Sequence, residues 1–80
     1  MKLTYDPKYN IAYIALRPKK RGKVKTVQVS DEVNVDFAAD GKIYGIELLN
    51  AIEQLSADRS MAVTIENKSS GKSRAIALAV

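Results

Sequence analysis

An Asp-Gly pair between two alternating apolar runs constrains this chain most, because that pattern is the strongest short-range signal for a β-hairpin. The pair is Asp40-Gly41, and the runs cover residues 33–39 and 42–49. A two-residue turn at this pair fixes the register of the hairpin. The predicted cross-strand pairs are Val33 with Leu48, Val35 with Ile46, and Phe37 with Tyr44. All six large apolar side chains then share one face.

The opposite face of this predicted hairpin is polar. It places Asn34 across from Glu47 and Asp36 across from Gly45, and a slip of one residue would exchange this row with the apolar one. Asp36 and Glu47 are diagonal neighbours, so their carboxylates form a candidate acid–base pair or hard-cation site. A solvated sheet face accounts for the same residues without a ligand. Gly45 is explained by a close backbone approach or a bulge.

Five further strands are predicted from short apolar or alternating runs bounded by turn residues. They cover residues 2–5, 11–16, 24–29, 61–66 and 74–80. The run 11–16 is apolar on both faces, so we expect it inside the sheet. Segments 61–66 and 74–80 are expected to form a second hairpin. The Ala-rich tail is also compatible with a helix, since Ala favours helices.

One short helix is predicted between the two hairpins. Asn50 is a suitable N-cap residue, and Glu53 occupies the third helical position, where a capping-box acid reaches back to the cap. We therefore expect a helix over Ala51 to Ala57 that presents Ile52 and Leu55.

These elements define the expected fold class. The chain is predicted to be α+β and mainly β, an antiparallel β-meander of five to seven strands with one short helix. Residues 1–80 form a single small domain. At this length only a little over ~60% of the unfolded chain's surface becomes buried. The margin of stability is small, and a partner chain would increase it.

The composition narrows the possible chemistry. The chain has no cysteine and no histidine, so it has no disulfide, no zinc-thiolate site and no imidazole base. Ser70-Gly71-Lys72-Ser73 imitates a phosphate-binding loop but lacks the earlier glycine of that motif. We therefore expect no enzymatic activity, no cofactor and no metal. The start lacks a signal-peptide pattern, and no run is long enough to span a membrane, which favours the cytoplasm.

Positive charge is concentrated near the start of the chain. Residues 1–29 hold eight Lys or Arg against one Asp, and residues 30–80 hold five against eight acids. We call residues 17–25 the basic loop, because Pro18 and Gly22 interrupt any regular structure there. Its cations are Arg17, Lys19, Lys20, Arg21, Lys23 and Lys25. A solvated loop is the simple interpretation, and phosphate contact is the functional one.

Several short motifs occur in a recognisable order. They are Thr4-Tyr5-Asp6-Pro7, Ala12-Tyr13-Ile14, Val33-Asn34-Val35-Asp36, Asp40-Gly41 and Gly45-Ile46-Glu47-Leu48-Leu49. Over residues 1 to about 55 the chain resembles a small prokaryotic domain of unknown function, DUF2283. The resemblance implies a small β-rich fold and no established activity. Some relatives are encoded beside putative toxins as small partners, which implies a binding role. The chain departs from the family at Asn10, where members usually carry an acid.

Two functional hypotheses follow from these observations. The first is a non-enzymatic protein-interaction module, either a homodimer or an antitoxin-like partner of another protein. It rests on the small size, the narrow chemistry and the sheet edges that another chain could pair with. The alternative is nucleic-acid binding through the basic loop. Base-stacking aromatic residues usually accompany such binding, but Tyr13 and Tyr44 are expected in the core and not as stacking platforms, which counts against this alternative.

Charge reversal tests the nucleic-acid hypothesis. Replacing Lys19, Lys20 and Arg21 by Glu is expected to abolish any binding to DNA or RNA, because phosphate contacts release counterions. Binding is measured by fluorescence anisotropy at several salt concentrations and should fall steeply as salt rises. Affinity unchanged by the substitutions would remove the basic loop from consideration.

Overall fold

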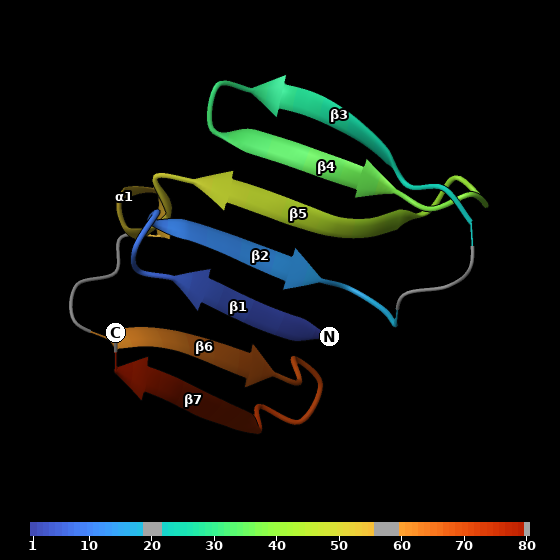
Figure 1. Cartoon of the computed structure of the whole chain (residues 1–80). Helices are drawn as coiled ribbons and strands as arrows, with labels where there is room; N and C mark the ends of the chain where they lie inside the picture. Colours follow the sequence, from blue (N-terminus) through green and yellow to red (C-terminus); the bar gives the residue numbers. More distant parts are fainter. Residues whose placement is uncertain (19–21, 56–59, 80) are drawn as a thin grey trace.

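The computed structural model describes residues 1–18, 22–55 and 60–79 (Figure 1). Within these residues, seven strands and one helix follow one another in sequence. They are β1 (Lys2–Asp6), β2 (Ile11–Ala15), β3 (Lys25–Ser30), β4 (Val33–Phe37), β5 (Ile43–Leu49), α1 (Ala51–Leu55), β6 (Ser60–Glu66) and β7 (Ser73–Ala79). The mainly β fold class with a single short helix is confirmed.

The first five strands form one antiparallel sheet in the order β1-β2-β5-β4-β3, and β6 and β7 form a separate two-stranded sheet. The order differs from an uninterrupted meander at one point, because β2 pairs with β5 and not with β3. This arrangement gives the apolar β2 a neighbour on each side, as the sequence predicted. The more polar β3 takes an edge, where one side of a strand remains unpaired.

The registers align apolar side chains in rows across the sheet. We call this side the apolar face. Its longest row crosses all five strands through Leu3, Ile14, Ile46, Val35 and Val27. A second row contains Tyr5, Ala12, Leu48 and Val33. The opposite side is the polar face, with a row formed by Thr4, Tyr13, Glu47, Asn34 and Gln28.

The Asp40-Gly41 hairpin forms with part of the predicted register. Val33 pairs with Leu48 and Val35 with Ile46, as expected, but Phe37 pairs with Ile43 and not with Tyr44. The turn contains three residues: the Ala38 N–H donates to the Lys42 carbonyl over 2.8 Å, and Gly41 has a φ of 84°. Gly41 tolerates this left-handed conformation. A bulge beside Phe37 absorbs the extra residue and restores the outer register.

The helix α1 begins at Ala51 as predicted, but its cap comes from elsewhere. Asn50 has a φ of 53° and does not cap the helix through its side chain. Instead the Asn10 Oδ1 accepts a hydrogen bond from the Ile52 N–H over 3.0 Å, and the Asn10 carbonyl accepts from the Ala51 N–H over 2.9 Å. The Asn10 Nδ2 donates to Glu53 over 3.0 Å, so Glu53 does not reach back to residue 50.

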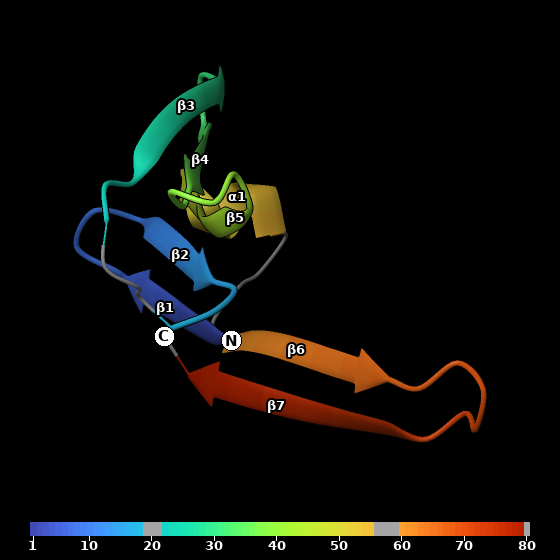
Figure 2. The same ribbon diagram turned by 90° about the vertical axis from the view of Figure 1, so that its right-hand side faces the viewer.

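The C-terminal segments form the predicted hairpin, and the alternative of a C-terminal helix is wrong. Val63 pairs with Ile76 and Met61 with Leu78 along an antiparallel ladder. The alternation of large and small side chains suits a strand better than a helix. The hairpin is a sheet of its own, and Figure 2 shows it projecting away from the five-stranded sheet.

Few side chains are buried in this arrangement. Among the described residues, the buried hydrophobic side chains are Ala12, Ala51 and Met61, and no large side chain is fully buried. No helix in the described ranges is long and apolar enough to cross a membrane. As far as the structure describes the chain, the fold therefore consists of one five-stranded sheet, a short helix and a projecting hairpin, without a second layer over the sheet.

Replacing Asn10 is expected to destabilise the fold. The change Asn10→Ala removes the side-chain cap of α1 and places Ala, which tolerates the left-handed region less well than Asn, at a φ of 54°, for a combined loss of about 2 kcal/mol. Asn10→Gly is the matched control, because Gly accepts this φ without strain and loses only the side-chain contacts. Chemical denaturation measures both. Equal stability of the wild type and Asn10→Ala would show that the cap contributes nothing.

Candidate interaction site

The predicted polar pair, Asp36 and Glu47, is engaged by neighbouring side chains. Asp36 Oδ2 accepts a hydrogen bond from the Tyr13 hydroxyl and Oδ1 accepts one from the Thr26 hydroxyl, each over 2.6 Å. Glu47 accepts from the Asn34 Nδ2 over 2.9 Å. Each carboxylate thus joins neighbouring strands. This arrangement fits a structural role better than an acid–base pair.

Gly45 makes room for the Tyr13 side chain. A β-carbon at position 45 would stand 2.5 Å from the Tyr13 Cζ and 2.7 Å from its Cε1, and neither contact is tolerable. Tyr13 therefore crosses β5 from its place on β2 to reach Asp36 on β4. The sequence predicted a close approach at Gly45. The approaching group is a tyrosine ring and not a backbone segment.

The electrostatics of Tyr13 follow from this position. Burial raises the pKa of its hydroxyl above the ordinary value near 10, and the hydrogen bond to Asp36 and the charge of that carboxylate raise it further. A phenolate beside a carboxylate is unfavourable, so the neutral form predominates over the physiological range. Tyr13 acts here as a hydrogen-bond donor that connects two strands.

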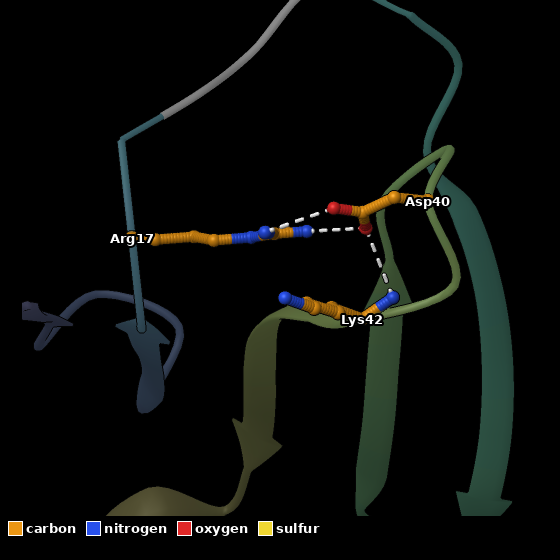
Figure 3. Close-up of polar contacts among 3 residues, drawn as sticks. All are labelled: Arg17, Asp40 and Lys42. Carbon is orange, nitrogen blue, oxygen red and sulfur yellow. Dashed lines mark hydrogen bonds and ion pairs between the residues drawn. The ribbon is translucent and has the colours of Figure 1, made fainter.

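Arg17, the first cation of the basic loop, pairs with the turn between β4 and β5 (Figure 3). Its two terminal nitrogens donate to Asp40 over 2.6 and 3.1 Å. Asp40 also accepts from the Lys42 N–H over 3.0 Å, which confirms its predicted role in the turn. The Arg17 guanidinium and the Lys42 N–H lower the pKa of Asp40. The pair is therefore complete near neutrality and is lost as pH falls below the ordinary range of Asp.

The other cations of the basic loop fall into two groups. Lys23 and Lys25 are exposed, and Lys25 begins β3 opposite Phe37. Lys19, Lys20 and Arg21 lie outside the described residues. Arg17 pairs with Asp40, and this pairing distinguishes it from the exposed Lys23 and Lys25. No group of three or more acidic or other metal-ligating side chains gathers within the described ranges.

The largest unassigned feature is the apolar face. Its long row contains no fully buried side chain: four of its members are half-buried, and Val27 at the end of the row is 38% exposed. The sequence predicted the apolar side of the Asp-Gly hairpin but not what covers it. The relevant signal was present in the sequence, because one helix of two turns cannot cover five strands. We take the apolar face as the candidate interaction site.

In the part of the chain that the structure describes, a five-stranded antiparallel sheet with one apolar face, one short helix and a separate two-stranded hairpin define the structural class of the protein. Its residues 2–51 match the family described as "Protein of unknown function (DUF2283)", and the chain belongs to that family. The match covers β1 to β5 and ends at the first residue of α1, so β6 and β7 lie outside it. No curated protein and no solved structure matches the chain.

The link between Tyr13 and Asp36 is testable by titration. Of the four tyrosines, Tyr13 is expected to ionise last, because its pKa is raised by burial and by Asp36. Asp36→Asn removes the negative charge and should bring this ionisation to lower pH, although burial remains. The phenolate absorbance measures both titrations, with Glu47→Gln as the control at a weaker neighbour. Identical curves for wild type and Asp36→Asn would contradict the hydrogen bond.

Proposed function

We propose that this chain is a non-enzymatic protein-interaction module that binds a protein partner through the apolar face. The observation that carries the proposal is the absence of a second layer over that face among the described residues. Burial of apolar surface against a partner would stabilise the complex by about 25 cal/mol for each Å² of apolar area removed from water. A contiguous apolar face across a whole sheet is typical of interaction sites and not of the free surface of a monomer.

The surface area of the chain supports this proposal. A compact folded chain of this mass exposes about 4,800 Å², whereas this one exposes 6340 Å². The difference is roughly 1,500 Å², and an obligate interface buries about 1,000 to 2,500 Å² on each partner. The radius of gyration is 14.2 Å, against about 12 Å for a compact chain of this length. A partner would account for the excess.

One of the sheet edges, which also suggested an interaction, is less suited to pairing. On β3 a register shift between Gln28 and Ser30 leaves Val29 out of the ladder. A bulge of this kind twists an edge strand and disfavours addition of another strand. The apolar face is therefore the stronger part of the proposal. We further propose a cytoplasmic location, since the chain has no cysteine and so cannot form the disulfides that are common in proteins of oxidising compartments.

A photo-cross-linking residue distinguishes the two faces. Val27 and Gln28 are adjacent, both exposed, and belong to the apolar and polar faces respectively. Benzoylphenylalanine in place of Val27 is expected to give a discrete protein adduct in cells producing the chain, and the same residue in place of Gln28 is not. Mass spectrometry identifies the adduct, including a second copy of the chain. Equal labelling from both positions, or none from position 27, would contradict the proposal.

A further inference from the structure

We propose that the partner on the apolar face is the β6–β7 hairpin of a second copy, exchanged reciprocally in a two-fold dimer. This inference rests on the proposed function and names its partner. It begins from a second apolar surface in the same chain. On the hairpin one side carries the large side chains Met61, Val63, Ile65, Ile76 and Leu78.

The hairpin presents these side chains to solvent. Ile65, Ile76 and Leu78 are 57%, 58% and 64% exposed, whereas Met61 at the start of the hairpin is 6% exposed. The opposite side of the hairpin is formed by small or polar residues, with Ala62 across from Ala77. A two-stranded hairpin is at best marginally stable in water without a packing surface. This hairpin therefore needs a partner for its large side chains.

The apolar face and the hairpin complement each other in chemistry and form. Both are β-structured and rich in branched aliphatic side chains, which suits the packing of one sheet on another about 10 Å apart. The hairpin stands away from the sheet of its own chain (Figure 2). Each copy thus carries both the β6–β7 hairpin, which acts as an arm, and the apolar face that would receive the arm of the other copy. A two-fold axis places each arm on the other copy's face, so the interface is made twice.

Charge gives the sheet two different ends. One end, where β1 finishes and α1 begins, carries Asp6, Asp31, Glu32 and Glu53 together with Lys8. The other end carries Lys2, Arg17, Lys23, Lys25 and Lys42 together with Asp40. We call them the acidic end and the basic end. The tip of the hairpin is positive, with Lys68, Lys72 and Arg74 near Glu66.

These charges favour a second copy over closure within one chain. Figure 1 shows β6 starting on the side of the molecule that carries α1 and running toward the side where β2 ends. Folded onto its own sheet in this direction, the hairpin would bring its positive tip to the basic end. A partner related by a two-fold axis perpendicular to the strands runs in the opposite direction and brings the tip to the acidic end. Like charges repel and opposite charges attract, so exchange is favoured.

The size of the interface is also consistent with two copies. If each copy buries its excess of roughly 1,500 Å², the dimer interface totals about 3,000 Å². This value lies within the range of obligate homodimers, about 2,000 to 5,000 Å². The exchange thus covers the apolar face and the hairpin by one set of contacts.

The mass of the full chain in solution is the first test. Light scattering of the purified protein should give twice 8.8 kDa. The change Ile76→Asp puts a charge on the hairpin's apolar side and should raise the dissociation constant at least about 30-fold, as for a hot-spot residue. Ala75→Asp is the matched control on the opposite side of β7 and should remain dimeric. Dimers of equal strength in both variants would overturn the inference.

Disulfide trapping identifies which copy the hairpin contacts, and the chain has no native cysteine to interfere. Mixed Val27→Cys and Ile76→Cys single variants should form a covalent dimer of the two, and Ala75→Cys should not. A monomer with an internal bond in the Val27→Cys, Ile76→Cys double variant would overturn both the inference and the proposed function. A monomer without that bond, whose position 27 cross-links another protein, would overturn the inference and leave the proposed function standing.

Discussion

The register of the five-stranded sheet is the constraint on which the rest of the structure depends. Because the strands pair without slipping at Val35 and Ile46, every strand contributes to the same apolar row, and the neighbouring row from Thr4 to Gln28 points the other way. One side of the sheet can therefore hold hydrogen bonds between strands. The apolar face can be stabilised only by burial against another surface.

The two sides contribute to stability in different ways. On the polar face, Tyr13 and Thr26 bind the same carboxylate of Asp36 from two other strands, so the sheet is connected across its strands by side chains as well as by backbone. Arg17 and Asp40 join β2 to the turn between β4 and β5 at the basic end. These contacts orient the strands, but they bury little apolar area. For an 80-residue chain that area is the main source of stability.

The sequence predicted local features better than long-range ones. The Asp-Gly hairpin, the pairing of Val35 with Ile46 and the existence of a helix at Ala51 depend on neighbours in the chain, and all were predicted. The pairing of Phe37 with Tyr44 failed because a three-residue turn and a bulge satisfy the same outer register. The cap from Asn10 was missed because it acts across forty-two positions. No pattern within α1 indicates it.

The uncovered face explains why the chemistry of single residues says little about the function of this chain. Its described polar groups are used between strands, and under the proposed function its apolar groups contact a partner, so recognition would be a property of surfaces. If the hairpin of a second copy supplies the cover, folding and association draw on the same burial of apolar area. Stability then depends on protein concentration, as it does for obligate dimers. The opposite charges at the two ends of the sheet would also select the orientation of the hairpin on the apolar face. They disfavour closure of the hairpin on its own chain and favour the arrangement in which the two copies run in opposite directions.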